Sequence, residues 1–526
     1  MPGMLAALLC AQLSACSVDD DGDAPARDAS AADVAADAGD GGAAPAVEAV
    51  PPEVAEHAGD WPLPNRDYDN TRADPDSPIR SDTIDGLREV WRLPLPAQAQ
   101  SAFGRMTAPA LVLGERVLTQ DMGSGVWALD RGSGEVLWQR RTGGATVGPN
   151  GVAVGWGKLF ANLGDTGIIA LNLDDGAEVW RFEPELHSSE GVDITPTVHA
   201  GRVFVSTVPA SLRGAYLGGS RGVLHALDQH DGTVRWRFDT VASDDLWGAP
   251  DVNSGGGAWY PPLIDVQSGI TYWGTGNPAP FPGTQGAPSG GSRPGDNLYT
   301  SSVLAIDGET GELAWYHQER PHDLFDWDFQ ATPVRVRPEP GEDGPDLVVG
   351  AGKTGTVVAL DPRTGELRWR AVVGIHENDD LLELPPDQSI EVLPGVLGGV
   401  LTPLAYAEGL IFAPVVNLAS AFTGATVGLS TRVVSGELVA LDAGDGHLVW
   451  SAELPRPTYA AATVVGDLVL TADDAGMVHA FARVDGEPVW SWQAPGGINA
   501  PLTVAGELLL VAAGVASDAA LVALRL

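Results

Sequence analysis

One alternation of apolar and polar positions recurs along most of the chain. Short runs rich in Val, Leu and Ile are separated by turns that contain Gly, Asp or Asn, which favours many short β-strands over long helices. Within this pattern an Ala is followed six residues later by a Gly, and four residues after that by a Trp. The arrangement occurs seven times: at Ala128–Trp138, Ala170–Trp180, Ala226–Trp236, Ala305–Trp315, Ala359–Trp369, Ala440–Trp450 and Ala480–Trp490.

Each copy predicts a strand, a tight turn whose Gly takes a positive φ, and a second strand whose Trp is buried against the neighbouring repeat. Two incomplete copies lie near the chain ends. Trp91 in "REVWRLPL" lacks the first half, and Ala520–Leu526, "ALVALRL", lacks the Trp. Because these halves complete each other, we predict an all-β, eight-bladed β-propeller whose chain ends share one blade. A linear solenoid is the alternative, and it requires capping repeats at both ends.

Length and charge narrow the function. The chain has 526 residues and 44% hydrophobic content, which is enough for a large core. Its 30 basic and 70 acidic residues give a formal net charge of −40. Such a surface repels phosphate backbones and anionic lipid head groups, so we expect no nucleic-acid partner.

The first sixty residues predict two short segments before the propeller. The apolar run Met4–Leu13 leads into Leu13-Ser14-Ala15-Cys16, which resembles a bacterial lipoprotein signal and implies cleavage before Cys16 and lipidation of its sulfur. The run is too short to span a bilayer. An apolar N-terminus without signal function is the alternative. Residues 17–60 contain twelve Asp or Glu and one Arg, which predicts a disordered acidic tether between a signal at 1–16 and a propeller at 61–526.

The stretch "RPHDLFDWDFQ", Arg320–Gln330, sets three carboxylates among aromatic rings, which is unusual for a half-buried strand. Strand order in an antiparallel blade brings the connection after the fourth strand and the loop after the second strand to one face. This places five residues at one mouth of the ring: Thr195, Trp259, Asn277, Asp323 and Lys353. Each taken alone is ordinary turn chemistry, but their convergence indicates a ligand site.

The Ala-x-Asp-x-x-x-Gly-x-x-x-Trp template resembles the tryptophan-docking motif of two groups of proteins. These are the eight-bladed pyrroloquinoline quinone (PQQ) dehydrogenases and the lipoprotein scaffold of the outer-membrane barrel-assembly machinery. The longer stretch "GTGNPAPF…RPGDNLY…YHQERPHDLFDWD" is similar to the methanol and ethanol quinoprotein dehydrogenases.

The dehydrogenase resemblance implies roles for the residues at the mouth. Asn277 and Asp323 match Ca²⁺ ligands, and Asp323 also matches the catalytic base. Lys353 matches the lysine that contacts the quinone, Trp259 matches the tryptophan that stacks on it, and Thr195 is expected beside the cofactor. A hard Ca²⁺ prefers carboxylate and amide oxygens, and an ionised carboxylate can take a hydroxyl proton while hydride leaves carbon. Asp326 and Asp328 either support the metal or cap the turn, and the sequence does not separate these roles.

The chain departs from this family pattern at several positions. The ligating Glu is replaced by Tyr216, and the Arg that holds a quinone carboxylate is replaced by Asn150. The vicinal Cys pair is absent, since Cys10 and Cys16 are the two cysteines of the sequence, and the later Asn-Trp motif becomes Val400-Leu401.

Two functional hypotheses therefore stand. The first is a lipid-anchored quinoprotein oxidoreductase that oxidises an alcohol or sugar with PQQ and Ca²⁺. The second is a non-catalytic propeller that binds proteins or polymers. Since the sequence has no Cys-x-x-Cys-His, an enzyme requires a separate electron carrier such as a c-type cytochrome. We expect it at the cell envelope, on the periplasmic side or the cell surface, with membrane contact through the N-terminal lipid alone.

The signal interpretation predicts the effect of Cys16→Ser. A serine hydroxyl cannot form the thioether that carries the lipid, so the variant should remain unprocessed or partition into the aqueous phase. Detergent phase partitioning of the wild-type and variant proteins measures this. Equal partitioning of the two would contradict the lipoprotein signal.

Overall fold

The computed structural model describes residues 49–97, 101, 103–338, 344–515 and 518–526, and within them it is nearly all β. The predicted all-β fold is confirmed. The lipidation site, Cys16, lies outside the described residues. Among the described residues, no helix combines the length and apolar character that crossing a membrane requires.

Eight sheets of the described chain contain four or more strands each. The core strands of seven sheets succeed one another along the chain. The first four of these sheets comprise β3 (Leu111–Leu113), β4 (Arg116–Gln120), β5 (Gly125–Asp130) and β6 (Val136–Arg141); β7 (Val152–Gly155), β8 (Lys158–Asn162), β9 (Ile168–Asn172) and β10 (Glu178–Phe182); β11 (Thr197–His199), β12 (Arg202–Ser206), β15 (Val223–Asp228) and β16 (Val234–Asp239); and β18 (Leu263–Ile264), β19 (Ile270–Gly274), β21 (Ser302–Asp307) and β22 (Leu313–Gln318).

The remaining sheets show the same antiparallel order with additions. They comprise β23 (Val334–Val336), β24 (Leu347–Ala351), β25 (Thr356–Leu360) and β26 (Leu367–Val372); β28 (Ala405–Ala407), β29 (Leu410–Thr423), β30 (Thr426–Asp442) and β31 (Leu448–Leu454), with β27 (Ser389–Val392) on the far half of β29; and β32 (Thr463–Val465), β33 (Leu468–Ala472), β34 (Met477–Ala482) and β35 (Pro488–Gln493), with β1 (Ala73–Asp74) parallel to β32.

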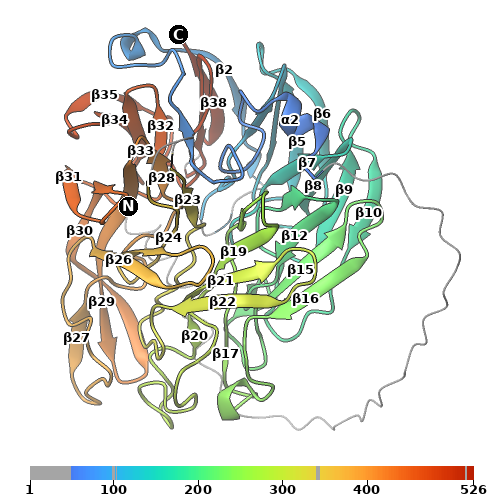
Figure 1. Ribbon diagram of the computed structural model, residues 1–526. Coiled ribbons are helices and arrows are strands. Elements are labelled where there is room, and N and C mark those ends of the chain that lie inside the picture. The colour runs from blue at the N-terminus through green and yellow to red at the C-terminus, as the bar shows by residue number, and fades with distance from the viewer. Residues whose placement is uncertain (1–48, 98–100, 102, 339–343, 516–517) are drawn as a thin grey trace, which may run out of the picture.

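The eighth sheet combines strands from both ends of the chain. β36 (Thr503–Ala505), β37 (Leu508–Ala513) and β38 (Ala520–Arg525) are followed by β2 (Arg88–Pro94), which pairs antiparallel with β38. Figure 1 shows the sheets succeeding one another in chain order around a circle, so that the last sheet lies beside the first.

Shorter elements connect and flank these sheets. They are the strand pairs β13 (Ala210–Ser211) with β14 (Gly214–Ala215) and β17 (Ser254–Gly255) with β20 (Pro278–Ala279), the helix α2 (Pro52–Glu56), and two 3₁₀ turns at Ile84–Gly86 and Leu246–Gly248.

The repeat tryptophans join neighbouring sheets. Trp315, for example, donates its indole N–H to the carbonyl of Pro362 at 3.0 Å, while its ring lies against Gly365 in the turn of the next repeat. Six further tryptophans make the same pair of contacts one repeat ahead: Trp91, Trp138, Trp180, Trp236, Trp369 and Trp450. A Cβ on Gly365 would lie 2.5 Å from the ring, so this close approach requires glycine, whose φ is +71°.

Trp490, in β35, has no such turn ahead of it among the described residues, because the eighth sheet pairs β38 with β2 and no hairpin turn joins these two strands. The segment before β2 joins these two sheets instead. The fully buried guanidinium of Arg72 donates to the carbonyls of Ala462 and Leu502, each at 2.8 Å, and thereby links the segments that precede β32 and β36. Ser77 adds a hydrogen bond to the carbonyl of Gly506.

The expected tether ends earlier than Asp60, so that boundary is wrong for its last residues. The helix α2 packs beside β7, and the carboxylate of Glu53 accepts the backbone N–H groups of Trp156 and Gly157. Asp60 pairs with Arg131 at 2.9 Å. These acidic residues are therefore held by specific partners on the propeller rather than solvated.

The tryptophan contact predicts a difference between two Gly→Ala variants. Gly365 and Gly269 both have a positive φ, of +71° and +77°, but nothing lies within 4 Å of a Cβ built on Gly269. Gly269→Ala should lose about 1–2 kcal/mol of unfolding free energy through backbone strain. Gly365→Ala should lose about 1–3 kcal/mol more, because its methyl group collides with Trp315. Urea unfolding measures both, and equal losses would contradict the docking role.

Candidate functional site

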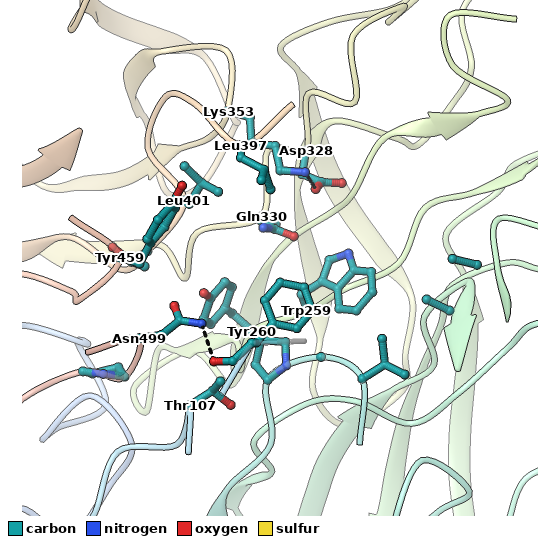
Figure 2. A pocket seen from close by; sticks show the side chains of 18 of the residues that line it. Thr107, Trp259, Tyr260, Asp328, Gln330, Lys353, Leu397, Leu401, Tyr459 and Asn499 are labelled. Atoms are coloured by element: carbon teal, nitrogen blue, oxygen red, sulfur yellow. Dashed lines mark hydrogen bonds and ion pairs between the residues drawn. The ribbon is translucent and has the colours of Figure 1, made fainter. Parts of the chain in front are cut away.

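A cavity of about 150 Å³ lies where the connections between sheets converge. Most of its wall comes from the segments that lead into the first strand of successive sheets. The lining residues are Phe103, Thr107, Val147, Gly148, Pro149, Ala210, Ala215, Tyr216, Trp259, Tyr260, Asp328, Gln330, Lys353, Leu397, Leu401, Thr402, Tyr459, Asn499 and Pro501. Figure 2 shows Lys353 and Asp328 at one end, Thr107 and Asn499 at the other, and Gln330 and Trp259 between them.

One lysine and two aspartates form a charged cluster at one end of this cavity: Lys353 and Asp328 line it, and Asp326 contacts Lys353 without lining it. The Nζ of Lys353 lies 2.6 Å from Oδ2 of Asp328 and 2.9 Å from Oδ2 of Asp326. The backbone N–H of Asn277 donates to Oδ1 of Asp328 at 2.8 Å. All four residues are almost completely buried. Lys353 comes from the turn after β24 and Asn277 from the loop after β19, so the predicted convergence of these loops is present.

The electrostatics of the cluster follow from burial and from its unequal charge. Burial acts to lower the pKa of Lys353, but the two carboxylates outweigh it and the pKa lies above its ordinary value. Burial raises the pKa of Asp326 well above its ordinary value, against the lowering effect of Lys353. A single cation between two buried carboxylates therefore leaves one of them under-compensated.

Asp326 carries two further signs of a functional position. Its φ is +63°, which is uncommon for a residue with a side chain and directs the carboxylate toward Lys353. Its Oδ1 is buried and has no hydrogen-bond partner among the described residues. The same is true of Oδ1 of Asn277. Unpaired buried oxygens are costly, and these two belong to residues that contact Lys353 and Asp328 in the cavity wall, so the cluster is a candidate place for a ligand.

Asp323, which the sequence assigned as base and metal ligand, has a structural position instead. Its Oδ1 accepts the backbone N–H of Phe325 at 3.0 Å, and its Oδ2 accepts that of Trp327 at 2.9 Å. The side chain is fully buried and does not line the cavity. Both oxygens thus cap the turn that carries Asp326 and Asp328. That assignment is corrected: the turn-capping role, left open for the other two aspartates, belongs to Asp323.

Of the two remaining residues expected to contact the cofactor, one lines the cavity and one does not. Trp259 lines the cavity, with its six-membered ring against Gly148. Thr195 does not line it, because its hydroxyl donates to the backbone carbonyl of Asn150 at 2.7 Å. Asn150 is itself fully buried and donates to the carbonyl of Asp121, so it supports the wall from behind.

Tyr216 lies in the wall near the three aspartates, at the position where the resemblance implied a ligating Glu. Burial, and after it the charges of Asp328, Asp326 and Asp323, raises the pKa of its phenol well above the ordinary value. The ring stays uncharged and packs edge-on against Phe281, with 5.4 Å between ring centroids. It contributes apolar surface to the wall.

Sequence reasoning missed the residues at the end of the cavity away from Lys353. Thr107, Tyr260, Tyr459 and Asn499 each lie in the segment before a first strand. That shared position was the signal available in the sequence, because Trp259 has it too.

The oxygen atoms at the charged end fit a hard cation such as Ca²⁺. Asn277 and Asp326 each offer an unpaired buried oxygen, and Asp328 offers a second carboxylate beside them. A quinone ring fits the face of Trp259 and the charge of Lys353. The three carboxylates of PQQ fit this cavity less well than its ring does, because they lack cationic partners. Lys353 is the one basic residue among the described residues that line the cavity, and it is already paired with two aspartates.

Comparisons with known proteins relate separate parts of the chain to two families. The family described as "Glucose/ethanol/alcohol dehydrogenase, beta-propeller domain" matches residues 190–379. The family described as "Outer membrane protein assembly factor BamB" matches residues 71–181 and 434–525.

Two individual relatives match longer parts of the chain. Quinohemoprotein alcohol dehydrogenase ADH IIB of Pseudomonas putida is 28% identical over 491 residues, which cover 80% of this chain and 68% of the relative. Quinohemoprotein alcohol dehydrogenase of Comamonas testosteroni is 28% identical over 340 residues, 58% of this chain and 45% of its own length. The chain thus spans less than half of this second relative.

Two solved structures share the fold. The crystal structure of the Comamonas testosteroni enzyme superposes with a TM-score of 0.77 at 20% identity, over 90% of this chain and 81% of that one. A europium-containing methanol dehydrogenase superposes with a TM-score of 0.75 at 20% identity, over 90% of this chain and 100% of that one.

The capping role of Asp323 predicts graded destabilisation. Asp323→Ala leaves the buried N–H groups of Phe325 and Trp327 without acceptors and should lose about 2–6 kcal/mol of unfolding free energy. Asp323→Asn retains one acceptor oxygen and should lose roughly half as much. Urea unfolding of both variants checks this. Unfolding midpoints equal to that of the wild type would contradict the capping role.

Proposed function

Because the chain is a divergent member of the PQQ-dependent alcohol dehydrogenase-like β-propeller family, we propose that it is an oxidoreductase that oxidises an alcohol or a sugar with a quinone as electron acceptor. The observation that carries the proposal is the buried cluster of Lys353, Asp326, Asp328 and Asn277 at the end of an aromatic cavity. A protein that only binds other proteins has no chemical need for this cluster.

Asp326 is the proposed proton acceptor. Its free Oδ1 and its raised pKa suit a general base, which must hold an available oxygen of sufficient basicity. Asp328 is less suited, because its two oxygens are occupied by Lys353 and by the backbone N–H of Asn277. Asp323 supports both from the turn.

Lys353 and Trp259 are the proposed contacts for the quinone. Lys353 presents a buried positive charge at the cavity wall, and Trp259 presents an aromatic face beside it. A bound quinone would supply the two-electron acceptor that no side chain of this cavity offers.

Asn277, Asp326 and Asp328 are the proposed cation ligands, with Ca²⁺ as the expected ion. A bound cation would restore the charge balance of the cluster and favour the ionised form of Asp326. Since the site offers two carboxylates, it also suits an ion of higher charge, and a trivalent lanthanide belongs in the same binding experiment.

The electron carrier and the location remain part of the proposal. A c-type cytochrome is the proposed carrier, because the chain has no covalent haem motif. Lipidation at Cys16 would hold the protein at the cell envelope, facing the periplasm or the outside.

The match to the outer-membrane assembly factor over residues 71–181 and 434–525 favours a second candidate, a propeller that binds proteins or polymers. The two candidates differ in the cavity. A binding scaffold requires neither a quinone nor a cation there.

Replacement of Asp326 discriminates between them. Asp326→Asn keeps the shape of the side chain and removes the basic oxygen, so dye-linked oxidation of alcohols or sugars should fall by roughly 10²- to 10⁴-fold with an unchanged melting temperature. Asp445→Asn, in an exposed turn far along the chain, is the matched control and should retain full activity. Wild-type protein that neither binds a quinone with Ca²⁺ or a lanthanide present nor oxidises any substrate would overturn the proposal.

A further inference from the structure

The end of the cavity opposite Lys353 is uncharged. We call four uncharged polar residues the neutral end: Thr107 and Asn499, which lie farthest from Lys353, and Tyr260 and Tyr459, which lie between them and Lys353. Burial raises the pKa of Tyr260 to about 12 and that of Tyr459 further still, so both remain phenols at any physiological pH. The hydroxyl of Tyr459 is buried and has no hydrogen-bond partner among the described residues.

The basic residues near the neutral end are already occupied. Arg456 makes two hydrogen bonds of 2.8 Å to the carboxylate of Asp474. Arg72 lies outside the wall and directs all five of its N–H groups to protein oxygens. Neither guanidinium lines the cavity, and the charge of Arg456 is balanced by the carboxylate of Asp474.

The charged end of the cavity cannot balance the negative charge of an acidic ligand either. Lys353 faces two carboxylates, so the cluster has an excess of negative charge before any ligand enters. A divalent cation bound there would offset that excess, but it lies at the other end of the cavity from Asn499. An acid group placed at the neutral end would lose its hydration without gaining an ionic partner.

From this distribution of charge, we propose that the cavity selects a planar quinone whose outer end is uncharged, and that it binds such a quinone more tightly than PQQ, which carries three carboxylates. The inference rests on the proposed function, since it takes for granted that a quinone occupies the cavity. The apolar and aromatic wall accepts flat rings, and the phenols and amide of the neutral end offer neutral hydrogen bonds to hydroxyl or carbonyl groups.

Two planar three-ring ortho-quinones test the proposal: PQQ and 9,10-phenanthrenequinone, which has no acid group. Equilibrium dialysis of the full chain with Ca²⁺ present should give a Kd for phenanthrenequinone at least about tenfold below that for PQQ, a difference of about 1.4 kcal/mol. Trp259→Ala should weaken the binding of both, which separates the cavity from other apolar surface.

Asn499→Lys places a cation at the neutral end, and Asn499→Met is its matched control, of similar length and uncharged. Both lose the hydrogen bond from Asn499 to the carbonyl of Phe103. Asn499→Lys should tighten PQQ about tenfold, with the gain reduced in 0.5 M NaCl, whereas Asn499→Met should not.

The outcomes separate this inference from the proposed function. Wild-type protein that binds PQQ more tightly than phenanthrenequinone would overturn the selectivity and leave the oxidoreductase in place. Protein that binds neither quinone would overturn both.

Discussion

The contact between each repeat tryptophan and the glycine turn of the following repeat is the interaction on which the rest of the structure depends. It fixes the distance and the angle between adjacent sheets, because the indole N–H is held by one carbonyl while the ring lies against a residue without a side chain. Seven such contacts carry the chain around a circle. The segments before the first strands are then forced toward the centre, where Trp259, Asp328 and Asn499 meet although they are far apart in the sequence.

The fold could be predicted from the sequence because each repeat specifies its own strands, turn and tryptophan contact through residues close together in the chain. Ala, Gly and Trp at fixed spacing predict two strands, a turn and a docking ring, and the structure contains each of them. The loops of the site were also predicted to converge, and Lys353, Asn277 and Trp259 do so. The end of the tether was misjudged, since composition alone does not show that Glu53 finds two backbone N–H groups to accept.

The roles of the three aspartates could not be read from the sequence, for a conformational reason. Asp323, Asp326 and Asp328 lie within six residues of one turn, and which of them reaches the cavity depends on backbone angles. The positive φ of Asp326 turns its carboxylate toward Lys353, while Asp323 points back into the turn. Similarity to a family motif drew attention to this stretch, but it did not show that both oxygens of Asp323 are taken up by the turn. At Tyr216 and Asn150 an uncharged residue replaces a Glu and an Arg of the family pattern. The effect of these replacements on ligand binding depends on the charge of the whole cavity.

The link that Arg72 makes between the segments before β32 and β36 affects how the protein folds during its synthesis. The hydrogen bond from Arg72 to Leu502 joins residues 430 positions apart, and β2 pairs with β38, which is similarly distant in the sequence. During synthesis, Trp91 and Leu93 emerge from the ribosome hundreds of residues before the strand that will cover them. Closing so long a loop is slow, because its entropy must be lost before any contact forms. The nascent chain therefore carries an unpaired strand edge until β38 has been synthesised, and this edge is a natural target for a holding chaperone.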